Sequence, residues 1–312
     1  MSSQHDIYDL IIIGAGPAGL TASIYASRYR IHHLVLATSL GGAMATASSV
    51  ENYPGFKAIS GLELTNKMVE QTKNLGGEIK LEEAVEIKKT AEGFLLTVTG
   101  GKTYTAKALI LATGTSRQKL GIPGEKEYLG KGVSYCSTCD AAFFRNKTVA
   151  VVGGANAAVM SAVHTAEFCH KVYLVYRRKP LRAEPIWVER VEKNPKITVL
   201  YETQIIEILG NNQFVTEAKL NHPVEGSDKL KVDGVFIEIG GVPLTDLVKP
   251  LGVEIDERSL VHVKPNMATN VQGLYAAGDI ANVSGELQQI IVACGEGALA
   301  ALSAFKYLKG GQ

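Results

Sequence analysis

A strand, a glycine-rich turn and a helix follow one another at the start of the chain, and this order restricts the fold more than any other feature. Residues 7–13 form a short, β-branched, mainly apolar run, which predicts a buried parallel strand. The turn Gly14-Ala15-Gly16-Pro17-Ala18-Gly19 comes next, and small residues with helical spacing continue to Arg28. In this context GxGxxG indicates a dinucleotide-binding unit: the first glycine makes the tight turn, the second admits pyrophosphate, and the third lets helix and strand pack closely.

The acidic residue that usually binds the ribose in such a unit is missing. It normally ends the second strand, but the predicted strand 34–36 is followed by Ala37 and Thr38. The ribose must therefore be bound in another way, and we do not expect the first nucleotide to be a plain NAD.

A second strand-to-helix turn lies near the middle of the chain and makes the sequence an internal two-fold repeat. The predicted strand 148–152 leads into residues 153–158, which read GxAxxA. Gly153 keeps the first position of the fingerprint, but Ala155 stands where a glycine normally makes room for pyrophosphate. We expect this methyl group to weaken or displace the phosphates without abolishing binding.

Arginines follow the next predicted strand, residues 172–176, where an NAD-binding protein would place an acid. They are Arg177, Arg178 and, one turn later, Arg182. A solvated basic turn would explain them without any ligand. Because they follow a nucleotide-type turn, they favour the ribose 2′-phosphate of NADPH over NADH.

Two thiols stand three positions apart in Cys136-Ser137-Thr138-Cys139-Asp140. Such a pair can open and close a disulfide, one thiol attacking a partner and the other resolving the mixed disulfide. The adjacent carboxylate of Asp140 is a suitable group to carry protons to and from the sulfurs. Half of a structural zinc site is the alternative. Zinc needs four ligands, and the other two cysteines, Cys169 and Cys294, stand alone. The sequence therefore favours a redox dithiol and predicts no metal site.

Two features near the C-terminus fit the first nucleotide unit. Residues 273–279 predict a buried strand that ends in a Gly-Asp turn, and the Asp279 carboxylate can hold a sugar or ribitol hydroxyl. A helix cap or simple turn residue is the alternative. Residues 290–308 have helical spacing and small side chains, which suit packing against the first unit.

Composition limits the class of protein and its partners. A chain of 312 residues is long enough for two domains. Its 32 Lys+Arg and 31 Asp+Glu give a net charge of +1, which argues against nucleic acid or a membrane surface as the main partner. Four cysteines and a polar start without a signal-peptide pattern favour the cytosol.

With these motifs in this order, the chain resembles the low-molecular-weight thioredoxin reductases, a family of FAD- and NADPH-dependent flavoproteins. The resemblance covers nearly the whole chain and rests on residues 14–19, 41–42, 50–55, 112–114, 136–140, 177–178 and 276–279. It implies an α/β fold with two Rossmann-like nucleotide-binding domains, the second inserted into the first. Residues 1–116 plus 243–312 would form the FAD-binding domain, and residues 117–242 the NAD(P)H-binding domain that carries the dithiol.

The same resemblance implies which residues bind each cofactor. Those expected to bind FAD are Gly14, Gly16, Pro17, Ala18, Gly19, Gly41, Gly42, Asn52, Ala112, Thr113, Gly114, Gly278, Asp279 and Gln289. Those expected to bind NADPH are Gly153, Ala155, Arg177, Arg178 and Arg182.

Roles for the dithiol also follow from the family. Cys139 would face the flavin, Cys136 would attack the protein disulfide, and Asp140 would be the acid–base group. Rotation about hinges near residues 112–116 and 240–242 would bring the dithiol and the nicotinamide to the flavin in turn. A thioredoxin-like partner and a homodimer are implied as well. Because no cysteine precedes Cys136, the chain does not match the glutathione-reductase-like relatives.

Four departures from the family pattern concern the electron donor. Beside Ala155, Tyr176 replaces a usual His, Ala141 a usual Gly, and residues 288–289 read Gln-Gln instead of Arg-Gln. We therefore expect an NADPH-driven reductase of a thioredoxin-like protein and keep two alternatives. One has the same flavin–dithiol chemistry with a ferredoxin-type donor or with oxygen as acceptor, and the other is a non-enzymatic redox sensor.

Overall fold

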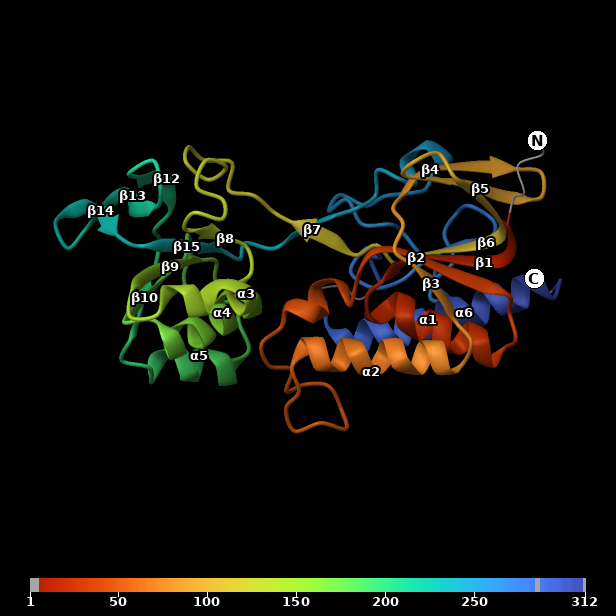
Figure 1. Ribbon diagram of the computed structural model, residues 1–312, viewed down its shortest axis with the longest axis horizontal. Helices are drawn as coiled ribbons and strands as arrows, with labels where there is room; N and C mark the ends of the chain where they lie inside the picture. The colour runs from red at the N-terminus through yellow and green to blue at the C-terminus, as the bar shows by residue number, and fades with distance from the viewer. Residues whose placement is uncertain (1–5, 284–286, 311–312) are drawn as a thin grey trace. The chain divides into compact units, whose positions relative to one another are not determined.

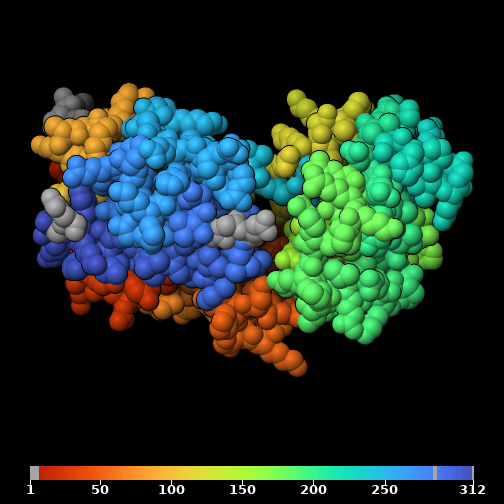
Figure 2. Space-filling model, turned by 180° about the vertical axis from the view of Figure 1, so that it is seen from behind, coloured from red at the N-terminus to blue at the C-terminus, as the bar shows by residue number. Residues whose placement is uncertain are grey.

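A computed structural model describes residues 6–283 and 287–310 of the chain. The chain forms two compact units, which we describe separately (Figure 1). Unit 1 joins residues 1–116 to residues 242–312, and unit 2 consists of residues 117–241. Val242, which we expected in the second unit, belongs to the first. In Figure 2 the C-terminal segments, in blue, cover most of the visible face of unit 1 above the N-terminal segments in red, so both chain ends build this unit.

Unit 1 is built on a sheet that has seven strands within the described residues, in the order β3-β2-β1-β6-β5-β4 with β17 also paired to β6. β1, β2, β3, β6 and β17 pair in parallel, whereas β4 and β5 add an antiparallel edge. The strands are β1 (Asp6–Ala15), β2 (His33–Leu40), β3 (Glu78–Lys80), β4 (Ala84–Thr90), β5 (Gly93–Val98), β6 (Thr103–Leu111) and β17 (Leu274–Ala276). The apolar run that predicted the first strand is fully buried at Leu10, Ile11 and Ile12, as expected for a strand covered on both faces.

Helices cover this sheet: α1 (Pro17–Arg28), α2 (Gly61–Asn74) and α6 (Ile290–Leu308), with short 3-10 turns η1 (Gly42–Thr46) and η3 (Lys249–Leu251). α1 and α6 pack closely, since a Cβ on Gly297 would lie 2.1 Å from the Ala18 carbonyl oxygen. By length and composition alone, α6 is the one described helix that could cross a membrane. Its alanines Ala300, Ala301 and Ala304 are fully buried in the core of unit 1, which is how a core helix of a folded domain behaves.

Unit 2, whose residues are all described, contains a five-stranded parallel sheet in the order β11-β10-β9-β15-β8. These strands are β8 (Val133–Ser134), β9 (Thr148–Val152), β10 (Lys171–Val175), β11 (Ile197–Leu200) and β15 (Gly234–Ile237). Its helices are α3 (Ser137–Asp140), α4 (Asn156–Phe168) and α5 (Pro185–Glu192), with the 3-10 turn η2 (Ala141–Phe144). A three-stranded antiparallel sheet of β12 (Ile205–Gly210), β13 (Val215–Val224) and β14 (Ser227–Lys231) completes the unit.

Alternate residues of the central strand β9 serve two cores in unit 2. Val149 and Val151 pack in a cluster with the α4 residues Val159 and Ala162. Ala150 and Val152 belong to a second cluster, which includes side chains of β12, β13 and β14. This period of two is the one expected for a strand with both faces covered. The predicted class, α/β with two Rossmann-like units, is confirmed.

The chain passes between the units on two short strands that pair with each other, β7 (Thr115–Arg117) and β16 (Gly241–Pro243). The Gln118 N–H donates to the Gly240 carbonyl at 3.0 Å. Both segments lie where the hinges were expected.

Candidate active site

The first glycine-rich turn has the geometry that its sequence predicts. Gly14 has a φ of 112°, and a Cβ there would lie 2.1 Å from the Ala112 carbonyl oxygen. A Cβ on Gly19 would lie 1.9 Å from the Gly14 carbonyl oxygen, so helix α1 packs too closely on β1 for any side chain. At Gly16, in contrast, the nearest described atom to such a Cβ is the Gly41 carbonyl oxygen at 4.0 Å. The turn is therefore packed at its first and third glycines and open at its second, where a pyrophosphate would approach.

The N-terminus of α1 is free to bind an anion. Gly16 is its N-cap, and no side chain among the described residues caps the first turn. The first N–H groups of a helix have no partner within the helix, and they carry the positive end of its dipole. The arrangement suits a phosphate group.

The remaining residues expected to bind FAD in unit 1 come together around this turn at the carboxyl ends of the strands. The Gly41 N–H donates to the Ala15 carbonyl at 2.8 Å, and the Ala112 N–H donates to the Ile13 carbonyl at 2.7 Å. A Cβ on Gly278 would lie 3.0 Å from the Ala18 Cβ. Segments from four places in the sequence therefore meet at one edge of the sheet.

Asp279 lies at this edge with a carboxyl group that receives no hydrogen bond from the described residues. Burial raises the pKa of Asp279. A half-buried carboxyl group without a protein donor fits a ligand hydroxyl better than a turn or cap role, because buried polar groups are normally hydrogen-bonded.

Glu296 is a second buried carboxyl group at this site, which the sequence analysis missed. The Gly278 N–H donates to its Oε2 at 2.7 Å, while its Oε1 has no partner in the described part of the chain. Burial raises the pKa of Glu296 to about 7, the nearby Asp279 adds to the rise, and the Gly278 N–H opposes it. The sequence does carry one sign of it, because a glutamate is unusual inside a helix of small residues. The reason for this glutamate, its hydrogen bond with the Gly278 N–H, is visible only in the folded structure.

Asn52 and Gln289, far apart in the sequence, contact each other directly. The Asn52 Nδ2 donates to the Gln289 Oε1 at 2.9 Å, and Gln289 is the N-cap residue of α6. The neighbouring Tyr53 hydroxyl lies 4.0 Å from the Cys294 sulfur, which itself lies 3.9 Å from the Pro17 carbonyl oxygen. This chain of contacts links the expected pair to the phosphate turn.

Thr113 and Gly114 follow β6 and contact the returning chain of unit 1. The Thr113 hydroxyl donates to the Leu244 carbonyl at 3.4 Å, and the Leu244 N–H donates to the Gly114 carbonyl at 3.2 Å. Both residues therefore lie next to the β7–β16 segment that leads to unit 2.

The second nucleotide turn repeats the first with less room. Gly153 has a φ of 140°, and a Cβ there would lie 2.2 Å from the Glu238 carbonyl oxygen. Ala155 is the exposed N-cap residue of α4, and no side chain in this fully described unit caps the helix. The helix end is free for an anion, but Ala155 carries a methyl group where Gly16 has none.

The expected arginines lie beside this turn. The Arg182 N–H donates to the Gly154 carbonyl at 2.7 Å, and the Arg182 Nε donates to the Tyr176 hydroxyl at 3.1 Å. Arg177 and Arg178 are exposed and form no ion pair with any described residue. Three guanidinium groups next to a helix N-terminus can bind a phosphate group by charge-assisted hydrogen bonds.

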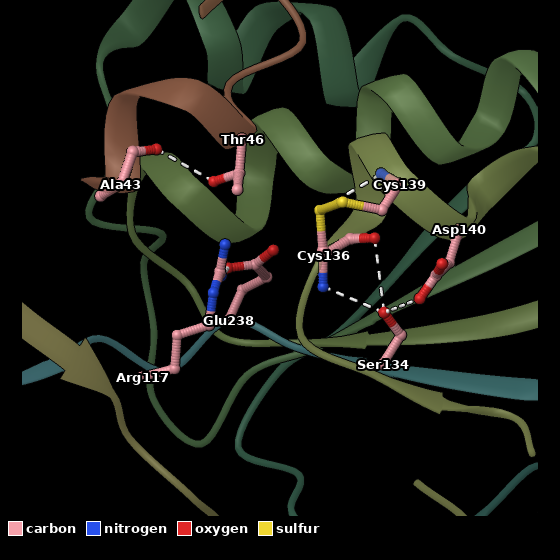
Figure 3. A network of polar contacts seen from close by, with 8 residues as sticks. All are labelled: Ala43, Thr46, Arg117, Ser134, Cys136, Cys139, Asp140 and Glu238. Atoms are coloured by element: carbon pink, nitrogen blue, oxygen red, sulfur yellow. Dashed lines mark hydrogen bonds and ion pairs between the residues drawn. A yellow bond between two sulfur atoms is a disulfide. The ribbon is translucent and has the colours of Figure 1, made fainter. Parts of the chain in front are cut away.

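Cys136 and Cys139 form a disulfide whose Cα atoms are 5.3 Å apart. Cys136 is the N-cap residue of α3, and the Cys139 N–H donates to the Cys136 sulfur at 3.2 Å (Figure 3). Asp140 ends α3, and its Oδ2 accepts a 2.6 Å hydrogen bond from Ser134, a residue that the sequence analysis did not single out. Cys169 and Cys294 are buried free thiols. Among the described residues, no cluster of His, Cys, Asp or Glu could hold a metal ion.

A buried carboxylate supports the residue that precedes the dithiol. Glu125 is 5% exposed, and its oxygens accept from the Tyr135 hydroxyl at 2.5 Å and from the N–H groups of Leu120 and Gly121. Burial alone would raise the pKa of Glu125, but these hydrogen bonds outweigh it and lower the pKa. Glu125 therefore stays ionised, and its hydrogen bond holds the side chain of Tyr135, the residue just before Cys136.

An ion pair that the sequence did not reveal lies at the carboxyl end of β15. Arg117 Nη1 lies 2.8 Å from the Glu238 Oε2 (Figure 3). Burial raises the pKa of Glu238 to about 7, although Arg117 lowers it. Because the Glu238 carbonyl also contacts Gly153, the pair lies next to the second nucleotide turn, between β9 and β15, where doubly wound sheets bind nucleotides.

Known proteins resemble this chain along nearly its whole length. The family model described as pyridine nucleotide-disulphide oxidoreductase matches residues 8–297. The thioredoxin reductase of Listeria monocytogenes is 43% identical over 311 residues, which are 99% of this chain and 96% of that protein. The solved thioredoxin reductase of Lactococcus lactis in its FR conformation has a TM-score of 0.92 and 35% identity, covering 97% of this chain and 99% of that one. For the T. acidophilum enzyme the TM-score is 0.91 and the identity 38%, with 97% and 99% covered.

Proposed function

We propose that this chain, which belongs to the pyridine nucleotide-disulphide oxidoreductase family and within it to the thioredoxin reductases, passes electrons from NADPH through FAD and the Cys136–Cys139 dithiol to the disulfide of a thioredoxin-like protein. The observation that carries the proposal is the Cys136–Cys139 disulfide, which lies in a unit with its own nucleotide turn. The net reaction consumes NADPH, one proton and the partner's disulfide, and it yields NADP⁺ and two partner thiols.

We assign FAD to unit 1. The open space at Gly16, the free N-terminus of α1 and the carboxyl group of Asp279 together fit a dinucleotide with a hydroxylated chain. This binding needs no acid after β2, which explains why Ala37 and Thr38 are compatible with it. When bound, FAD would accept two electrons from NADPH and pass them on to the disulfide.

We assign NADPH to unit 2. Its 2′-phosphate would bind Arg177, Arg178 and Arg182, and its pyrophosphate would bind the N-terminus of α4. The methyl group of Ala155 would crowd the pyrophosphate of NADPH and NADH to the same extent. The arginines thus set the preference for NADPH, whereas Ala155 sets the affinity for both coenzymes.

In the reduced protein, we assign the attack on the partner to Cys136. The Cys139 N–H donates to the Cys136 sulfur, and such a hydrogen bond favours the thiolate of Cys136. A bond forms between Cys136 and one partner sulfur as the partner's disulfide breaks, and the released sulfur takes a proton. Cys139 then attacks Cys136, which reforms their disulfide and releases the second partner sulfur, again with a proton.

We assign the proton transfers of these steps to Asp140. Two electrons and two protons leave the dithiol and end on the partner, so each step needs a group that takes a proton from a thiol and gives one to a leaving sulfur. Asp140 is adjacent to Cys139 in the sequence, and Ser134 holds its carboxyl group.

The partner and the cellular setting complete the proposal. The homodimer in this proposal rests on the family that the chain belongs to. The net charge of +1 argues against nucleic acid or a membrane as partner, and the four cysteines favour the cytosol. Rotation of the units about β7 and β16 would present the dithiol and the nicotinamide to the flavin in turn.

The decisive experiment is an anaerobic titration of the purified protein with NADPH, NADH and a reduced ferredoxin. NADPH at micromolar concentration should bleach the visible flavin absorbance, and NADH should do so only at much higher concentration. Denatured protein should release FAD. If the flavin responds to ferredoxin and not to millimolar NADPH, the donor in this proposal is wrong while the flavin–dithiol part stands.

A further inference from the structure

The hydroxyl group of Ser134 connects the two ends of the segment that carries the dithiol. Ser134 ends β8, is 5% exposed and is held in the sheet by parallel pairing with Phe236 of β15. Its Oγ donates to the Asp140 Oδ2 at 2.6 Å (Figure 3). The Asp140 carboxyl group is thereby tied to the central sheet of unit 2 and not only to its own four-residue helix.

The same oxygen has two backbone partners in Cys136. The Cys136 N–H donates to the Ser134 Oγ at 3.0 Å, and the Cys136 carbonyl oxygen lies 3.3 Å from it as a second acceptor for the hydroxyl proton. A serine hydroxyl donates one proton and can accept two hydrogen bonds. Ser134 therefore has two acceptors to choose from, while the Cys136 N–H donates to it in either case.

This choice matches both protonation states of Asp140. When the carboxylate is ionised, Ser134 donates to it, and 2.6 Å is a length typical of O–H···O⁻. When the carboxyl group is protonated, its O–H can donate to the Ser134 Oγ, and Ser134 turns its own proton to the Cys136 carbonyl. In both states every polar group of this network has a hydrogen-bond partner. The site therefore avoids the destabilisation that a buried polar group without a partner would cause.

We propose that Ser134 is a positioning residue for the dithiol, which holds the Asp140 carboxyl group in one place while that group gains and loses a proton. The inference rests on the acid–base role that the proposed function gives to Asp140. Ser134 forms no bond to sulfur and only reverses the direction of its hydrogen bond. Its removal should therefore slow the exchange steps that need a proton and spare those that do not.

The test compares two small disulfides with the dithiothreitol-reduced, full-length flavoprotein, freed of reductant and without NADPH. Hydroxyethyl disulfide has a basic leaving thiolate that needs a proton, whereas dithionitrobenzoate has an acidic leaving thiol that does not. Ser134→Ala should slow exchange with hydroxyethyl disulfide about tenfold, less than the roughly hundredfold or more that a general acid contributes, because the Asp140 carboxyl group is still present. Its exchange with dithionitrobenzoate should change by less than about twofold, because nucleophilic attack by Cys136 is untouched.

Two further variants make the result specific. Ser137→Ala is the matched control, since Ser137 is also buried, at 7% exposed, and its hydroxyl makes no hydrogen bond to a described residue; both of its rates should stay near wild type. Asp140→Asn should slow exchange with hydroxyethyl disulfide more than Ser134→Ala does. The double variant should be no slower than Asp140→Asn, because Ser134 acts through that carboxyl group.

Several outcomes would overturn the inference. The exchange rates of Ser134→Ala could equal those of Ser137→Ala, or they could fall equally for both disulfides. In the double variant, the effect of Ser134→Ala could also add in full to that of Asp140→Asn. Each of these results would show that Ser134 has no specific link to proton transfer. If Asp140→Asn exchanges at the wild-type rate, the acid–base part of the proposed function fails and the inference fails with it. If Ser134→Ala does not fold, Ser134→Thr keeps the hydroxyl: a rate within about threefold of wild type supports the inference, and one as low as that of Asp140→Asn overturns it.

Discussion

The Nε of Arg182 donates a 3.1 Å hydrogen bond to the hydroxyl of Tyr176. Tyr176 is buried, and its ring lies so close to Gly154 that a Cβ on this glycine would be 2.3 Å from the ring. The ring of Tyr176 thus packs against the backbone of the second nucleotide turn, and its hydroxyl holds Arg182 beside this turn. This contact gives a structural role to a residue that departs from the family pattern.

Tyr176→Phe should therefore weaken NADPH binding and leave NADH binding unchanged. Phenylalanine keeps the ring over Gly154 but loses the hydrogen bond to Arg182, which is worth about 1 kcal/mol, or roughly fivefold in KM for NADPH. Tyr173→Phe, on the preceding strand, is the matched control. The measurement is the initial rate of anaerobic flavin bleaching at varied coenzyme concentration. An equal loss for NADPH and NADH would show that Tyr176 does not act through the 2′-phosphate.

Replacing both Arg177 and Arg178 by alanine should erase the preference for NADPH, since both are exposed and free of ion pairs within the described chain. Loss of charge-assisted contacts costs a few kcal/mol, on the order of a hundredfold in discrimination. The same bleaching assay gives the ratio of kcat/KM for the two coenzymes. A ratio that stays at the wild-type value would mean that these arginines form only a solvated surface turn.

Ala155→Gly should improve the use of both coenzymes by the same factor. Removing the methyl group makes room for pyrophosphate, which NADPH and NADH share. The change should not weaken the fold, because glycine is a better N-cap than alanine. Ala157→Gly, at an exposed position in the first turn of α4, is the control and should leave KM unchanged. The idea fails if Ala155→Gly changes the preference between coenzymes and not the affinity for both.

The nucleotide turns could be predicted because their determinants are local. Gly14, Gly16 and Gly19 stand in one strand–turn–helix segment, and the close approach of Gly19 to the Gly14 carbonyl lies within it, whereas the contact of Gly14 with Ala112 appears only in the folded sheet. Ser134 and Glu296 could not be found in this way. Each acts on a group brought near by folding: Ser134 donates to Asp140 across the dithiol segment, and Glu296 of α6 accepts from the N–H of Gly278, which follows β17. A serine or a glutamate alone in a sequence carries no sign of such a partner.

The two thiols should have different roles. Cys139→Ser should leave Cys136 able to trap a thioredoxin-like partner as a mixed disulfide, because the resolving thiol is gone. Cys136→Ser should trap no partner. Both variants should lose turnover by on the order of a thousandfold or more while NADPH still bleaches their flavin. Trapping can be read on a non-reducing gel with thioredoxin that lacks its own resolving cysteine. Trapping by Cys136→Ser in place of Cys139→Ser would reverse the assignment.

Glu125→Gln should destabilise unit 2 at neutral pH. Glutamine cannot supply the charge that accepts hydrogen bonds from Tyr135 and two backbone N–H groups, a loss of roughly 2 kcal/mol. Because folding lowers the pKa of Glu125, its contribution is present above the ordinary value of 4.5 and is lost as the pH falls through the folded-state pKa. The difference from wild type should therefore shrink in acid.

Trp187, the one tryptophan of the chain, is buried in unit 2 and reports the unfolding of this unit in urea. Glu127→Gln, two positions away and exposed, should leave the transition unchanged. A difference between Glu125→Gln and wild type that grows below pH 5 would contradict the predicted sign.

Glu296→Gln should flatten the pH dependence of FAD retention in unit 1. Burial raises the pKa of Glu296 from its ordinary 4.5 to about 7, so the folded protein holds this proton more tightly than the unfolded chain. The protonated carboxyl group therefore contributes to the free energy of unfolding. This contribution is fully present below pH 4.5 and is lost as the pH rises through 7, a decrease of up to roughly 3 kcal/mol. Glutamine resembles the protonated acid and can still accept from the Gly278 N–H. The variant should therefore melt like wild type near pH 5 and at a higher temperature at pH 8, as read from the rise in FAD fluorescence on release.

Glu92→Gln, at an exposed turn of the same unit, should follow wild type at both pH values. A Glu296→Gln protein that loses FAD more readily at pH 8 would show that the ionised carboxylate is needed at this site.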